Sequence, residues 1–184
     1  DLSQVSLEEI EKRLLPIKDY PAHALTIASV LPLFPHYNLQ RRLELCKKLK
    51  LSNLEQQFVT FLTHAQEFVS QDRIAEKIEW AYFYANAFAP VSLQIISAHL
   101  EPRKQAAFLR HHEEQMELLA PSIARIKSQD PVVKSNDLMA AGVKPGVAMG
   151  LLLQEADRIA INEGLHEPAP IIQRLKEMSI WPKS

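Results

Sequence analysis

All four glycines of this 184-residue chain lie between residues 142 and 164, so the long stretch before them contains none. β-Hairpin turns depend on glycine, and this distribution therefore excludes a β-rich fold. Leucine and alanine together number 45, whereas valine and threonine number 12, and this bias favours helix over strand. We predict an all-α fold, with a multi-helix body followed by a small C-terminal helical tail subdomain that contains a glycine-rich helix hairpin.

The charge balance and the lack of long apolar segments narrow the class of protein. The formal net charge is −1, which excludes a surface that is basic all over, so any contact with nucleic acid must be a local patch. The longest uncharged stretch, residues 20–40, contains three prolines and cannot form a membrane-spanning helix. No secretory signal is visible and Cys46 is the only cysteine. We therefore expect a cytoplasmic protein with no internal disulfide and no membrane contact.

The positions of prolines, serines and charged residues divide the chain into a predicted body, a linker and a tail. Ser6 with Glu9, and Ser52 with Glu55, have the spacing of helix-opening capping boxes, and residues 22–31 read as a buried apolar helix. We predict about seven helices in a body at residues 1–127. Residues 128–134 lack periodicity and contain a proline, so we expect a linker there. A helical tail subdomain should then occupy residues 135–184.

A basic helix is predicted between Asn38 and Leu51. Lysine and arginine neutralise phosphates without reading bases, so its cations are candidates for contact with an RNA backbone. A run of charges is also what an ordinary solvated helix face carries, and that alternative stays open. The five candidate residues are Arg41, Arg42, Lys47, Lys48 and Lys50.

The glycine-rich segment predicts two helices joined by a tight turn. A short helix at 137–141 should end at Gly142, because glycine accepts the left-handed conformation found just past a helix end. Pro145 suits the first position of the next helix, and Lys144 would lie beside the free amides at Gly146, which together form a phosphate-sized anion site. Gly150, inside the second helix, implies a close helix crossing. Tight packing alone could also explain these glycines.

The stretch from Asn136 through Leu153, continuing to Ala160, resembles the C-terminal segment of class II tRNA nucleotidyltransferases, which are the CCA-adding enzymes and the bacterial poly(A) polymerases. Residues 170–176 continue the resemblance, and a weaker one covers 42–59. The resemblance implies a transferase of tRNA processing whose helical body and tail hold the tRNA. With this resemblance, the candidate RNA contacts are Gly142, Lys144 and Gly146 of the glycine-rich segment, beside the cations of the basic helix. The resemblance also implies that Mg²⁺, ATP and CTP are used by a catalytic head.

The chain contains no Asp-x-Asp motif, the paired carboxylates that hold two metal ions in such a head. We therefore expect this chain to have no catalytic residues, metal or cofactor of its own, and to be the RNA-binding C-terminal portion of a nucleotidyltransferase. Whether the parent protein adds CCA or poly(A), and its oligomeric state, are left open by these residues.

Three further features, a histidine pair, a cysteine and an aromatic cluster, are interpreted as structural rather than functional. His111 and His112 are adjacent and cannot place two metal ligands on one helix face, so we expect a solvated surface. Cys46 is near Lys47 and Lys48, which could lower the pKa of its thiol, but we interpret it as an incidental cysteine. An aromatic cluster at residues 80–84 should be mostly core, with base stacking as the alternative; its members are Trp80, Tyr82, Phe83 and Tyr84.

Two other functions remain in competition with RNA anchoring. The glycine hairpin could be a helix-hairpin-helix element of a DNA-binding module, although only one such hairpin is visible. The near-zero charge is also compatible with a helical protein-interaction domain that binds no nucleic acid. A gel shift with tRNA, duplex DNA and RNA lacking an acceptor stem separates the three hypotheses.

Overall fold

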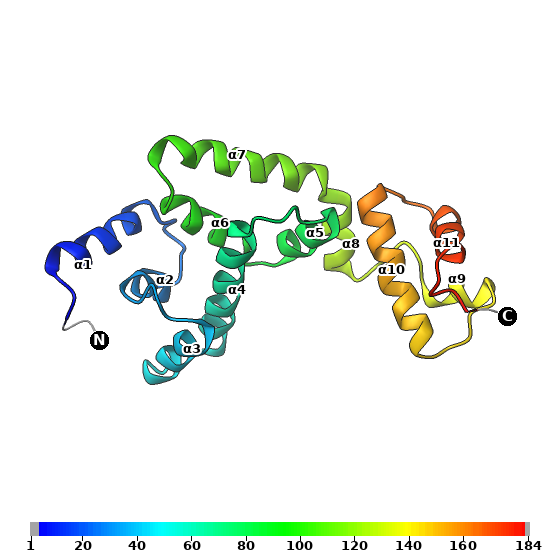
Figure 1. The fold of residues 1–184 in the computed structure, drawn as a ribbon, viewed down its shortest axis with the longest axis horizontal. Coiled ribbons are helices and arrows are strands. Elements are labelled where there is room, and N and C mark those ends of the chain that lie inside the picture. The colour runs from blue at the N-terminus through cyan, green and yellow to red at the C-terminus, as the bar shows by residue number, and fades with distance from the viewer. Residues whose placement is uncertain (1–3, 183–184) are drawn as a thin grey trace. The chain divides into compact units, whose positions relative to one another are not determined.

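The computed structural model describes residues 4–182, and every regular element in that range is a helix (Figure 1). This confirms the all-α prediction. No helix within the described range is both long and apolar enough to cross a membrane. The chain divides into two compact units, which are described separately. Unit 1 comprises the residues up to 73 together with 86–114, and unit 2 comprises 74–85 together with the residues from 115 onward.

Unit 1 is built around α4, whose start confirms the predicted capping box. The Ser52 hydroxyl accepts a hydrogen bond from the Glu55 amide, and the Glu55 carboxylate accepts one from the Ser52 amide at 2.8 Å. Phe58 and Leu62 of this helix are at most 1% exposed and form the core with Ile95. The helices of this unit are α1 (Leu7–Leu14), α2 (Ile27–Val30), α3 (Leu39–Lys48), α4 (Asn53–Ser70), α6 (Ala89–Ala98) and α7 (Pro102–Leu118), with 3₁₀ turns at Leu15–Asp19 and Leu31–Leu33; α7 runs on past residue 114.

Unit 2 is built around α10, which packs against α5, α9 and α11. Leu138, Leu152, Ile171 and Leu175 are completely buried in its core. The helices of this unit are α5 (Lys77–Ala85), α8 (Ala120–Ser128), α9 (Ser135–Ala140), α10 (Val147–Glu163) and α11 (Pro168–Lys176).

Contacts between distant parts of the sequence give units that differ from the predicted body and tail. α5 joins unit 2 because its first turn is bonded to α10: the Ile78 amide donates to the Asn162 side chain at 3.0 Å, and Glu76 pairs with Arg158 at 3.1 Å. The segment 128–134, predicted as a linker, contributes Val133, 2% exposed, to the core of unit 2. The lack of hydrophobic periodicity in residues 128–134 therefore indicates irregular backbone that packs on the core, and not a linker.

Two helix predictions need correction. The predicted helix at 22–31 is reduced to α2 at Ile27–Val30, because residues 21–24 form a turn in which the Ala24 amide donates to the Pro21 carbonyl. The sequence also predicts a helix opened by Asp72 with Ile74 on its buried face, whereas α5 begins at Lys77 and Ile74 is 97% exposed. The prolines and caps located the helices, whereas apolar composition alone overestimated their lengths.

Candidate nucleic-acid interface

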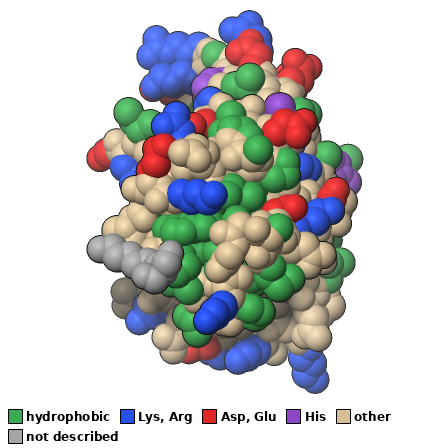
Figure 2. Space-filling model, turned by 90° about the vertical axis from the view of Figure 1, so that its right-hand side faces the viewer, with side chains coloured by type: hydrophobic (Ala, Val, Ile, Leu, Met, Phe, Trp, Pro, Cys, Tyr) green, Lys and Arg blue, Asp and Glu red, His purple; other side chains and the backbone are tan. Residues whose placement is uncertain are grey.

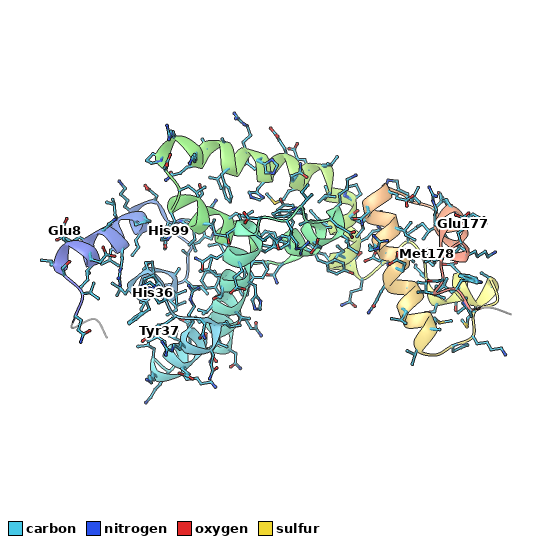
Figure 3. The ribbon with its side chains drawn as sticks, in the orientation of Figure 1. Glu8, His36, Tyr37, His99, Glu177 and Met178 are labelled. Carbon is cyan, nitrogen blue, oxygen red and sulfur yellow. The ribbon has the colours of Figure 1, made fainter. Side chains whose placement is uncertain are left out.

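The exposed cations of α3 lie in unit 1. The Asn38 side chain caps the helix by accepting a hydrogen bond from the Arg41 amide at 3.0 Å, and Cys46 is fully buried on the side that faces the core. Arg41 places its guanidinium carbon 5.9 Å from the ring centroid of Tyr37, which Figure 3 labels beside α3. The exposed members of the predicted set are Arg41, Lys47, Lys48 and Lys50; these four residues are called the α3 basic face below.

Arg42 differs from the α3 basic face because its guanidinium is used inside unit 1. Its Nε donates to the Tyr37 carbonyl at 3.0 Å. Its Nη1 donates to the Thr63 hydroxyl at 3.0 Å and to the Gln66 side-chain oxygen at 2.9 Å. Burial lowers the pKa of Arg42, whereas the charge of Glu67 raises it. Arg42 therefore ties α3 to α4, and we leave it out of the surface that could contact a phosphate backbone.

The end of α3 presents Lys50 in a conformation that is uncommon for lysine. Its φ is 55°, and the Lys50 and Leu51 amides donate back to the carbonyls of Lys47 and Cys46 at 3.0 Å each. This is the Schellman pattern in which glycine normally occupies the left-handed position. Lys47 and Lys48 also lie where the helix dipole favours positive charge, so local stability accounts for part of this basic cluster.

The segment between α9 and α10 confirms the predicted turn at Gly142. Gly142 has φ 94°, and the Val143 amide donates to the Leu138 carbonyl at 2.9 Å. Val143 is 3% exposed and fixes the turn to the core of unit 2. Lys144, the next residue, is exposed. One core side chain thus holds the turn in place while the neighbouring lysine stays accessible to solvent.

The start of α10 differs by two residues from the prediction. Gly146, with φ 151°, is the N-cap, and the helix begins at Val147. Pro145 therefore precedes the cap instead of occupying the first helical position. Gly146 has no side chain to cap the helix, and the Met149 amide donates to the Gly146 carbonyl at 3.1 Å. Among the described residues, the amides of Val147 and Ala148 are left without an acceptor, and Val147 is 85% exposed. The anion site stays a prediction, with its free amides now at the cap of α10.

The packing role predicted for Gly150 is wrong. Among the described residues, a Cβ added at Gly150 or Gly146 would meet no atom within 4 Å beyond its chain neighbours and the helix's own backbone, and both glycines are exposed. Within the described part of unit 2, no helix crosses this face closely, because the α10 contacts use the sides that carry Leu152 and Ala156. The alternative that explained the glycines by tight packing alone fails for the same reason.

Two side chains that were considered as a reactive thiol and as a metal ligand, Cys46 and His112, are buried. Cys46 is fully buried and burial raises the pKa of its thiol, so activation by the adjacent lysines is excluded. His112 is 3% exposed, contrary to the predicted solvated surface, with its ring centroid 4.5 Å from that of Phe108; His111 is exposed. Within residues 4–182 no three His, Cys, Asp or Glu residues gather as metal ligands would.

A pocket in unit 2 was missed by the sequence analysis. It has a volume of about 800 Å³ and lies between α5, α10 and the segment before α9. The Tyr82 hydroxyl donates to the Asp157 carboxylate at 2.7 Å, and burial, with a smaller effect of Asp157, raises the pKa of Tyr82 to about 12. At 53% exposed, Tyr82 departs from the predicted aromatic core, whereas Phe83 and Tyr84 are buried as expected. No sequence pattern joins residues 75 positions apart.

Comparison with protein-family models, with curated proteins and with solved structures found no match.

Proposed function

We propose that this chain is the RNA-anchoring C-terminal portion of a tRNA nucleotidyltransferase or bacterial poly(A) polymerase. The observation that carries the proposal is the start of α10, where an uncapped helix N-terminus, an exposed Lys144 and two exposed glycines without neighbours occur in one short segment. The same segment carries the resemblance to that family. The glycine-rich hairpin of a small tail subdomain belongs to this proposal.

The chemistry of the segment suits an RNA backbone better than RNA bases. Free first-turn amides and the positive end of the helix dipole attract anions. Glycine at residues 146 and 150 leaves no Cβ to hold a sugar-phosphate chain away from the helix. Lys144 adds a point charge. None of these groups distinguishes one base from another, so the expected contact is with phosphates and is independent of sequence.

The α3 basic face is proposed as a second phosphate contact, within unit 1. Its four cations are exposed, and Arg41 is the one that also stacks on an aromatic ring. Because the whole chain has a formal net charge of −1, such local clusters would have to supply the attraction. Catalysis would reside in a head domain that holds Mg²⁺ and the nucleotide, because this chain lacks the Asp-x-Asp carboxylates. The cytoplasm is the proposed compartment.

One observation favours a protein partner as the second candidate. Exposed large apolar side chains accompany the glycines in unit 2: Val147 is 85% exposed, Leu151 53% and Met139 43%. Figure 2 shows a face on which hydrophobic side chains gather between lysine and arginine side chains. A mixed apolar and basic surface of this kind serves protein recognition as well as RNA contact.

The test measures binding of the purified chain to labelled tRNA by fluorescence anisotropy, with duplex DNA as competitor. We expect tRNA binding that weakens with salt, and Lys144→Ala should reduce the slope of log K against log salt by about one. The matched control is Lys127→Ala, which removes an exposed lysine from α8 in the same unit. Both variants should melt like the parent chain, because neither lysine is buried.

Three outcomes would contradict the proposal. Equal salt slopes for the chain and for Lys144→Ala would mean that Lys144 neutralises no phosphate. Preferential displacement of tRNA by duplex DNA would favour a helix-hairpin-helix DNA module. No binding to either nucleic acid would favour the protein-interaction alternative.

A further inference from the structure

A small pocket in unit 1 is lined by two arginines and, among the residues that the structure describes, by no carboxylate side chain. Its volume is about 280 Å³, close to the lower limit of roughly 300 Å³ for ligand pockets. The apolar wall belongs to the core of the unit, with Leu31, Leu62 and Ile95 each at most 5% exposed. The arginines are Arg13 of α1 and Arg42 of α3.

Arg42 carries a charge that no acidic partner neutralises by direct contact. Its hydrogen-bond partners are the Tyr37 carbonyl, the Thr63 hydroxyl and the Gln66 amide oxygen, and these use three of its five N–H groups. The two N–H groups on Nη2 have no acceptor within the described residues. Glu67 influences its charge but does not form an ion pair with it.

Arg13 adds a second guanidinium to the same pocket. Its Nε pairs with Glu9 at 3.0 Å and its Nη1 donates to the Leu33 carbonyl at 3.1 Å. Its side chain is only 18% exposed, and Glu9 is not among the residues that line the pocket. Arg13 is therefore held in position from outside the pocket, and its Nη2 is left as a further donor.

The remaining polar lining is neutral and supplies mostly hydrogen-bond donors. The Tyr20 hydroxyl lies 2.5 Å from Nε2 of His99, the residue that Figure 3 labels. Burial raises the pKa of Tyr20 to about 12 and lowers that of His99, so both groups are uncharged at pH 7. The side-chain oxygen of Gln66 is occupied by Arg42, which leaves the Gln66 NH₂ group as donor.

A guanidinium beside a hydrophobic core, without a carboxylate, is an expensive arrangement unless an anion completes it. We propose that the pocket lined by Arg13 and Arg42 binds a small phosphate monoester. Phosphate fits better than carboxylate because the open donors on the two Nη2 groups and on Gln66 number six, whereas a carboxylate offers about four acceptor positions. The small volume of the pocket favours an isolated phosphate group on a small body or at a chain end.

This inference concerns unit 1 alone and does not depend on the proposed RNA contact at α10. The probe is sodium phosphate, titrated into the full chain by calorimetry, with sodium chloride holding the ionic strength constant. We expect saturable binding of one phosphate per chain. Arg42→Gln should weaken it at least tenfold, because the substitution removes a charged hydrogen-bond donor from the pocket.

Lys48→Gln is the matched control, because it removes the same charge from the exposed side of α3 and should leave phosphate affinity unchanged. Arg42 also joins α3 to α4, so Arg13→Gln gives a second variant that keeps that link. We expect it to be folded by circular dichroism and to bind phosphate at least tenfold more weakly. No saturable binding by the parent chain, or equal losses in Arg13→Gln and Lys48→Gln, would overturn the proposal.

Two sources of the phosphate group can be separated by competition. A 5′-phosphorylated trinucleotide that displaces phosphate, when its unphosphorylated form does not, would support a nucleic-acid end as ligand. Glycerol 3-phosphate displacing phosphate while neither trinucleotide does would support a small metabolite. Acetate binding as tightly as phosphate would refute the assignment to phosphate.

Discussion

Acid should destabilise unit 1 through one histidine, His112 of α7. The side chain is 3% exposed and lies against the ring of Phe108. Burial, with a smaller repulsion from His111, lowers the pKa of His112 from 6.5 to about 4. The folded protein therefore holds this imidazole neutral at a pH where the unfolded chain protonates it.

The sign and size of the effect follow from the two pKa values. Stability from His112 is complete above the unfolded pKa of 6.5 and is lost as the pH falls toward about 4. Each pKa unit corresponds to about 1.4 kcal/mol, so at pH 5 the unfolding free energy should have fallen by about 2 kcal/mol through this group. That loss is a large fraction of the stability of an average domain.

The assay is urea unfolding of the chain and of His112→Leu at pH 7 and pH 5, followed by circular dichroism. Other titrating groups are common to both proteins, so the difference in their pH-dependent losses isolates His112. We expect the parent chain to lose about 2 kcal/mol more than the variant, and His111→Gln, which removes the exposed neighbour, to retain most of the parent's loss. Equal losses in the parent and His112→Leu would refute the reasoning.

Other predictions concern backbone conformation and chemistry. Gly150→Ala should raise the unfolding free energy by about 0.5–1 kcal/mol, because the position is helical and open. Gly142→Ala should lower the unfolding free energy by roughly 1 kcal/mol or more, because the residue has a φ of 94°. Thermal melts of the two variants test both predictions. Lys50→Gly should stabilise α3 by up to about 1 kcal/mol at its left-handed position, measured by urea unfolding. The chain mixed with ATP, CTP, Mg²⁺ and tRNA lacking its 3′ end should incorporate no nucleotide above a no-protein control.

Local features of the fold could be predicted because the residues that decide them are close in sequence. The capping box at Ser52 and Glu55 is a contact between positions three apart, and the turn at Gly142 depends on a conformation that glycine adopts at little cost. Helix composition likewise predicted the all-α class. Such features need no knowledge of the tertiary structure.

Tertiary contacts explain where the sequence analysis failed. The Ile78 amide is capped by Asn162, 84 positions away, so α5 joins unit 2 even though it lies within the predicted body. Arg42 and Lys48 look equivalent as basic residues of one helix, yet only Arg42 reaches side chains of α4. His112 and His111 are adjacent in sequence, and only His112 is buried. In each case the neighbours of a residue, which sequence does not supply, decide its role.

Gly150 connects the stability of α10 with the proposed RNA contact. Its helical backbone does not require glycine, and no neighbouring atom of the described residues occupies the space of a Cβ. Neither conformation nor packing within unit 2 therefore offsets its helix cost of about 1 kcal/mol. Gly142 differs from Gly150, because its φ of 94° is a backbone conformation that by itself favours glycine. A glycine that stabilises nothing within the fold leaves the helix surface smooth one turn after the free amides at Gly146. An RNA backbone bound at those amides would contact that surface. The start of α10 therefore supports the proposed RNA contact more strongly than the α3 basic face does, because the lysines at the end of α3 already stabilise their own helix.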